Sequence, residues 1–119
     1  MTLDDYNGFC ALLPHTSHVV QWGGAHVWKV GGKVFAIGGW GNGERLAVTF
    51  KCSPMSFELL KESPGVRPAP YLASRGMSWL QRYDDISMDD ATLHDYLRER
   101  HRLVANGLPR KLRIDLGIA

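Results

Sequence analysis

Two pairs of adjacent glycines constrain the fold of this chain more than any other feature. They separate three short segments that are rich in β-branched and aromatic residues, at positions 18–22, 25–30 and 33–37. A Gly-Gly connection is typical of the turns that join antiparallel strands, because glycine adopts the positive φ angles that such turns require. The sequence therefore predicts consecutive hairpins and an antiparallel sheet in this part of the chain.

Two later segments extend the predicted sheet. After a looser Gly-rich turn at 38–43, residues 45–51 alternate cleanly between apolar and other side chains. Clean alternation predicts a strand with one face on the core and the other face in water. Residues 77–83 are expected to form a further strand. Residues 66–74 hold two prolines, which fix φ and bias the preceding residue, so no regular structure is expected there.

Three helices are expected beside the sheet. Residues 3–13 carry an apolar stripe behind a capping threonine, and Ser53-Pro54 is a strong start for a second, short helix. A third helix is predicted to begin at a Ser87 cap and to end near residue 106. The fold class is therefore α+β, an antiparallel sheet with helices packed on one face. The 119 residues form a single domain, 1–119.

Composition excludes several classes of protein. With 45% hydrophobic and 22% charged residues, the chain is neither disordered nor a membrane protein, and it has no repeat. The acidic N-terminus has no apolar segment, so no signal peptide is expected and the predicted location is the cytoplasm. Cys10 and Cys52 lie too far apart for a CxxC motif and are expected to remain reduced.

The residues favour no catalytic or cofactor site. The glycine runs lie between strands, unlike a nucleotide-binding loop, and the histidines are scattered rather than convergent, so no metal or cofactor is expected. Serines 53 and 87 are interpreted as helix caps. The protein is therefore not expected to be an enzyme. An enzyme that uses Cys52 or His101 is a third hypothesis, and it requires a depressed thiol pKa.

The net charge of +2 conceals a strong segregation along the chain. Residues 84–99 hold six acidic side chains and one arginine, whereas residues 100–119 hold five basic side chains and one aspartate. The helix macrodipole explains this pattern between residues 84 and 102, because it favours acids at a helix start and bases at its end. It does not explain the basic residues beyond 109, nor the basic excess in residues 51–83. A basic face is therefore possible despite the small net charge.

Basic residues that alternate with aromatic residues are the most specific remaining signal. Phosphate binding favours such cations on hairpins, loops and helix ends, although sheets also carry ordinary solvated charge on exposed faces. The candidate nucleic-acid-binding residues are Lys29, Lys33, Arg45, Lys51, Arg67, Arg75, Arg110, Lys111 and Arg113. Trp40, at a predicted hairpin tip, is a candidate for wedging or stacking between bases.

Arg100 breaks the pattern of its helix. It falls in the middle of an apolar stripe formed by Leu93, Tyr96, Leu97, Leu103 and Val104. One interpretation is that its stem packs while its charged head reaches water. The other is that it lines a cleft and holds a carboxylate or phosphate through two hydrogen bonds. Tyr71 and Trp79 are the aromatic residues that we consider for the same cleft.

The order of these landmarks resembles the MmcQ/YjbR family of small bacterial proteins. The matching segments are 28–36, the Lys-x-x-Pro motif at 51–54 with the three residues before it, 65–72, Trp79, 103–104 and 108–111. The resemblance implies a CyaY-like fold, called a double-wing DNA-binding architecture, and suggests DNA binding in the cytoplasm. One departure concerns Arg100 and His101, which stand where the family often has Ser-Tyr.

Two functions follow from these observations. The leading hypothesis is a monomeric, non-enzymatic DNA-binding protein that contacts phosphates from two hairpin wings and the basic residues after the last helix. The alternative is a module that binds a protein or a small ligand through the Pro-Ala-Pro loop, Tyr71, Trp79 and Arg100. An apolar cleft lined by those residues favours the alternative, whereas a continuous positive surface favours DNA.

Overall fold

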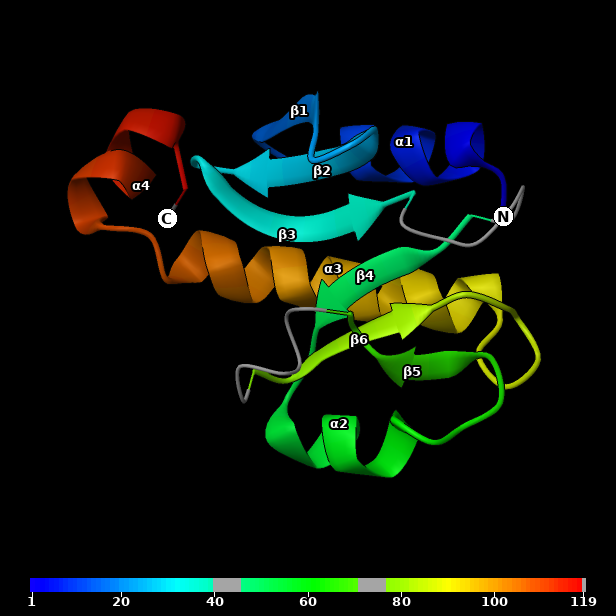
Figure 1. Ribbon diagram of the computed structural model, residues 1–119. Coiled ribbons are helices and arrows are strands. Elements are labelled where there is room, and N and C mark those ends of the chain that lie inside the picture. Colours follow the sequence, from blue (N-terminus) through cyan, green and yellow to red (C-terminus); the bar gives the residue numbers. More distant parts are fainter. Residues whose placement is uncertain (40–45, 71–76, 119) are drawn as a thin grey trace.

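Six strands form one antiparallel sheet in the computed structural model, which describes residues 1–39, 46–70 and 77–118. The order across the sheet is β1-β2-β3-β4-β6-β5 (Figure 1). Every neighbouring pair is antiparallel, as the sequence predicts. The strands are β1 (Thr16–Gln21), β2 (Ala25–Val30), β3 (Lys33–Gly38), β4 (Val48–Lys51), β5 (Val66–Pro68) and β6 (Trp79–Arg82).

Glycine turns join the first three strands. Gly31 and Gly32, between β2 and β3, have φ angles of 58° and 80°. The earlier glycine pair, between β1 and β2, has φ angles of 77° and 97°. All four lie in the left-handed region that glycine adopts without steric cost. Both pairs are therefore hairpin turns, as predicted.

Two helices cover one face of this sheet. Helix α3 (Asp90–Asn106) packs against β2, β3 and β4, and α1 (Leu3–Leu12) packs against β1 (Figure 1). The core between the helices and the sheet includes Phe35, Phe50 and Leu93, all fully buried. The shorter helices α2 (Pro54–Leu60) and α4 (Arg110–Leu116) lie at the periphery. The predicted α+β class is confirmed.

Side-chain caps begin the first two helices as predicted, but not the third. Thr2 and Asp5 form a reciprocal capping box, and Ser53 caps α2 with Pro54 at its first position. The prediction that Ser87 caps α3 is wrong, because Asp89 accepts the hydrogen bond from the Thr92 amide. The Ser87 hydroxyl instead donates to the Pro64 carbonyl and ties the loop before α3 to the turn between α2 and β5.

The sheet is buried on both sides around β4. The expectation that Ala47 and Thr49 face water is wrong, since both are 0% exposed. They lie on the face opposite α3, where a second apolar cluster contains Ala25, Val27, Ile37, Ala69 and Trp79. Alternation shows which residues share a face, but it does not show whether that face is covered.

Three further differences concern the second half of the chain. Residues 66–68, expected to be irregular, form β5, because Pro68 ends an edge strand where its missing amide is tolerated. Leu103, placed on the buried stripe of the last helix, is 48% exposed. Helix α4 was not predicted. None of the helices in the described residues combines the length and apolar character needed to span a membrane.

Candidate nucleic-acid interface

Three lysines gather at one end of the sheet. Strands β2 and β4 run in the same direction, because each is antiparallel to β3. Lys29 lies near the end of β2 and Lys51 at the end of β4, so both lie where these two strands end. In Figure 1, β2 ends at the left beside α4, and β4 ends nearer the middle. Lys33 begins β3 opposite Val30 and is exposed at the same end. Lys29 and Lys51 are half-buried.

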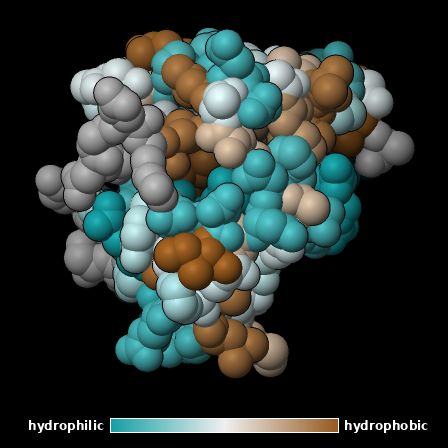
Figure 2. Space-filling model, turned by 90° about the vertical axis from the view of Figure 1, so that its right-hand side faces the viewer, coloured by the Kyte–Doolittle hydropathy of each residue, from teal (hydrophilic) through white to brown (hydrophobic). Residues whose placement is uncertain are grey.

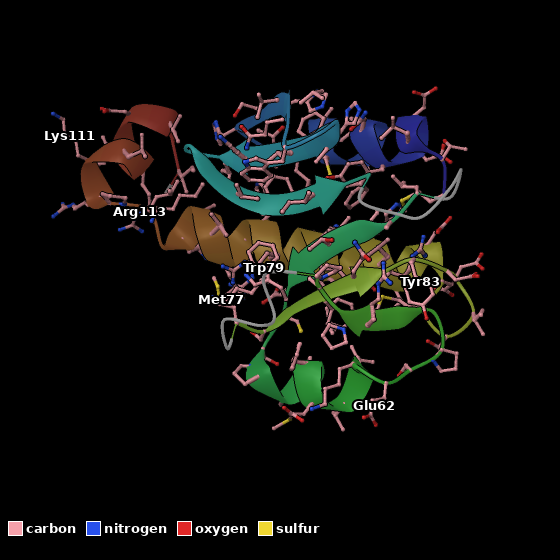
Figure 3. The ribbon with its side chains drawn as sticks, in the orientation of Figure 1. Glu62, Met77, Trp79, Tyr83, Lys111 and Arg113 are labelled. Carbon is pink, nitrogen blue, oxygen red and sulfur yellow. The ribbon has the colours of Figure 1, made fainter. Side chains whose placement is uncertain are left out.

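Helix α4 adds three cations to this end (Figures 1 and 3). Leu108, only 3% exposed, packs against the β2–β3 turn so closely that a Cβ on Gly31 would lie 2.5 Å from its Cδ1. This contact fixes the chain just before α4. Arg110 and Lys111 are exposed on the helix, Arg113 is half-buried, and Lys111 points away from the body of the protein. We call the surface formed by Lys29, Lys33, Lys51, Arg110, Lys111 and Arg113 the basic end.

None of the cations of the basic end has a carboxylate partner among the described residues, whereas four cations elsewhere in the fold have one. Elsewhere, Lys61 pairs with Glu58 at 2.7 Å and Arg98 pairs with Asp95 at 2.9 Å. Two further arginines, Arg82 and Arg102, pair with Asp90 and Glu99. Within residues 1–39, 46–70 and 77–118, Asp115 of α4 pairs with none of the basic residues near it. The basic end is therefore a concentration of charge that the described part of the fold does not neutralise.

The opposite end of the molecule is acidic. The N-termini of α1 and α3 and the loop before α3 meet there, and they carry Asp4, Asp5, Asp84, Asp85, Asp89 and Asp90. Figure 2 views this end and shows many hydrophilic residues with separate apolar patches among them. The hydrogen bond from the Thr92 backbone amide lowers the pKa of Asp89, so this cap remains ionised at neutral pH. Charge is thus segregated in space as well as along the sequence.

Arg67 lies outside the basic end. Its Nε donates to Gln81 Oε1 at 2.8 Å, and Gln81 Nε2 donates in turn to Thr49 Oγ1 at 3.3 Å. Its guanidinium also lies 5.0 Å from the centre of the Tyr83 ring. These bonds link three neighbouring strands on the face opposite α3. The side chain that the sequence suggested for phosphate contact is therefore held in a row of polar groups within the sheet.

The remaining candidates divide into two groups. Trp40, Arg45, Tyr71 and Arg75 lie outside the described residues. Trp79 is 8% exposed within the second apolar cluster, and its buried indole nitrogen finds no acceptor in the described part of the chain. In this position the Trp79 ring presents no open face for base stacking.

Arg100 lines a cavity of about 690 Å³ at the end of β4. Lys51, Cys52, Met77 and Leu103 contribute to the same wall, but Trp79 does not. The structure thus separates two residues that the alternative hypothesis assigns to one cleft. Burial raises the pKa of the Cys52 thiol to about 11, although the nearby Arg100 opposes this shift. This is opposite to the depressed pKa that a nucleophilic cysteine requires.

Sequence reasoning identified the cations of α4 but missed the helix that carries them. A signal was available, because Leu112 and Leu116 are four residues apart and Gly117 follows them. Gly117 adopts φ 77° and ends the helix. The contact between Leu108 and Gly31, which joins α4 to the turn, has no local signature in the sequence.

Comparison with known proteins places the chain in a family. A model of the YjbR family matches residues 11–103. A Deinococcus radiodurans protein with a DUF419 domain has a similar structure, with a TM-score of 0.81 and 23% identity over 99% of this chain and 89% of that protein. A Pseudomonas syringae protein has a TM-score of 0.70 and 15% identity, over 87% of this chain and 99% of that protein.

At these identities the two solved structures support the fold alone. No curated protein matches the chain. The family match covers most of the sequence and includes the motifs at 28–36, 51–54 and 65–72, so the resemblance drawn from those residues is confirmed. The chain belongs to the YjbR family.

Proposed function

We propose that this protein binds duplex DNA without catalysing a reaction, and that the basic end is the contact surface. The supporting observation is the gathering of six cations that have no carboxylate partner among the described residues. An unpaired exposed cation can exchange its counterions for a phosphate, whereas a paired one must first lose its carboxylate. We further infer that the protein acts as a monomer in the cytoplasm, where Cys10 and Cys52 stay reduced.

The opposite acidic end supports the same proposal. A molecule with charge of opposite sign at its two ends is oriented by the field of a polyanion before contact. The acidic end is repelled, so the basic end meets the phosphates first. With few phosphate contacts the affinity is weak, with a Kd on the order of 10⁻⁴–10⁻⁶ M at physiological salt. The contacts involve phosphates rather than base edges, so little sequence preference is expected.

A titration of fluorescently labelled duplex at two salt concentrations tests the proposal. The test variant combines Lys33→Gln, Arg110→Gln and Lys111→Gln, all exposed on the basic end. The matched control combines Lys61→Gln, Arg98→Gln and Arg102→Gln, which removes the same charge from paired positions. We expect the test variant to bind at least about tenfold more weakly at low salt, and the control within about threefold of wild type.

The salt dependence gives an independent readout. Each lost phosphate contact reduces the slope of log K against log salt by about 0.9, so the test variant should lose up to about 2.7. Absence of binding at low salt, or equal weakening of both triple variants, would contradict the proposal. Equal weakening would mean that only net charge matters and that the basic end is not a specific surface.

A further inference from the structure

We infer that the cavity at the end of β4 binds a small organic anion, a carboxylate or a phosphate ester attached to an apolar body. The inference concerns the cavity that Arg100 lines together with Lys51, Phe57, Met77 and Leu103. Its volume of about 690 Å³ lies within the range of small-molecule sites. The cavity shares Lys51 with the basic end, but the inference concerns a separate, small ligand.

Arg100 supplies the charge that would recognise the anion. Its Nε is buried without a hydrogen-bond acceptor, and the guanidinium has no ion-pair partner among the described residues. Arginine remains a cation at neutral pH even where burial lowers its pKa, as it does here. A half-buried cation without a partner is unfavourable, and a bound anion would remove that cost. The planar guanidinium fork matches a carboxylate or phosphate with two parallel hydrogen bonds.

The other charged groups on the cavity wall leave this role open. Glu58 also lines the cavity, but its carboxylate pairs with Lys61 at 2.7 Å. Lys51 lies on the wall without a carboxylate partner among the described residues and adds a second positive charge. The Cys52 thiol donates to the Ser78 carbonyl at 3.6 Å, and burial raises its pKa to about 11, so it contributes a neutral sulfur. The cavity is therefore positive at neutral pH.

Apolar side chains at the rim indicate the rest of the ligand. Met77 is 37% exposed and Leu103 is 48% exposed, and both line the cavity beside the half-buried Phe57 (Figure 3 labels Met77). Leu103 thus lies on the cavity rim rather than in the core, one helical turn after Arg100. Cations beside apolar walls suit an anionic group on a ring or short chain, because the body can be removed from water while the charge is paired.

Titration of the whole protein with benzoate and with phenyl phosphate, followed by amide NMR shifts, tests the inference. Benzyl alcohol controls for the apolar body, and inorganic phosphate controls for the charge. The variants are Arg100→Gln, Arg100→Lys and, as a matched control on the same helix, Arg102→Gln, whose guanidinium pairs with Glu99. We expect saturable shifts of residues 51–53, 77–78 and 100–103 with at least one of the two ring-bearing anions.

Arg100→Gln should weaken that binding at least tenfold, Arg100→Lys should weaken it less, and Arg102→Gln should leave it within about twofold. Comparison of the two anions distinguishes a carboxylate ligand from a phosphate ester. Equal binding of benzyl alcohol, no saturable binding of either anion, or unchanged binding by a folded Arg100→Gln variant would overturn the inference. It would also be overturned if Arg100→Gln weakened duplex binding while anion binding stayed unchanged, since Arg100 would then serve DNA.

Discussion

The two ends of this molecule treat charge in opposite ways. At the acidic end, Arg82 is 4% exposed and donates both to the Met88 carbonyl and to Asp90, at 3.0 and 2.9 Å. At the basic end, six cations have no carboxylate partner among the described residues. Removing one partner of a buried pair is costly because the other group is left unsatisfied, whereas exposed charges contribute little to stability. The paired charges of the acidic end contribute to the stability of the fold, whereas the unpaired charges of the basic end are the ones proposed to contact DNA.

The largest expected effect comes from breaking the acidic end. Arg82→Met removes the guanidinium but keeps much of the stem's volume, so the buried Met88 carbonyl loses its charged donor. Asp90 loses the same donor but is 45% exposed and keeps the N-terminal ammonium as a partner. The free energy of unfolding should fall by about 3 kcal/mol, measured by urea denaturation. The exposed Arg98, paired with Asp95, provides the control, and Arg98→Met should cost less than about 1 kcal/mol. Equal losses would mean that burial of the Arg82 guanidinium does not matter.

A smaller loss of stability is expected from substitutions in the β2–β3 turn, which contacts the chain just before α4. Gly31 and Gly32 both have positive φ, so alanine at either position is strained by about 1 kcal/mol. A Cβ on Gly31 would also lie 2.5 Å from Leu108, whereas at Gly32 it would meet open space. Gly31→Ala should therefore destabilise by about 2 kcal/mol in total and Gly32→Ala by about 1.

Amide hydrogen exchange gives a second measurement of the same pair. If Leu108 anchors α4 to the turn, Gly31→Ala should speed exchange within α4, and Gly32→Ala should not. Equal destabilisation of the two variants, with slow exchange in α4 in both, would show that α4 is held by other contacts.

The same contrast explains which parts of the molecule the sequence could predict. Hairpin glycines and the Ser53-Pro54 start act through backbone geometry within a few residues, and both predictions are confirmed. The prediction that Ser87 caps α3 is wrong because the Ser87 hydroxyl donates a hydrogen bond to the Pro64 carbonyl, which is distant in sequence. Whether a sheet face is covered, and which residues distant in sequence form hydrogen bonds, depends on tertiary structure and cannot be predicted from a local pattern.

The sequence predicted how charge is distributed along the chain, but not which cations form bonds within the fold. The segregation of acidic and basic segments is visible in the sequence, and it places Lys111 and Arg113 in a basic segment. In sequence, Arg67 is as good a candidate for phosphate contact as these two residues, but in the fold it donates to Gln81. A buried glutamine on the neighbouring strand carries no local sign that it will accept from that arginine. The strand register must therefore be known before a bonded cation can be distinguished from an available one.

The smallest expected effect is the pH dependence of stability that Asp90 gives to the acidic end. Burial is the largest single influence on the pKa of Asp90, and it raises that pKa. Hydrogen bonds from Arg82 and from the N-terminal ammonium together outweigh burial, so the net effect is a lowered pKa. A carboxylate with a lowered pKa in the folded state stabilises the fold above its ordinary pKa of 3.8, and this contribution is lost as the pH falls through the folded value. Wild type should therefore lose stability on acidification from about pH 5 to pH 2.

Asp90→Asn isolates this contribution. At neutral pH the variant should be less stable than wild type by at most about 1 kcal/mol, because the Asp90 side chain is 45% exposed and solvent screens the pair. The difference should shrink towards zero as the pH falls below the folded pKa, where wild-type Asp90 is also neutral. A difference that stays constant from pH 7 to pH 2 would show that the hydrogen-bonding shape of Asp90, rather than its charge, stabilises the acidic end.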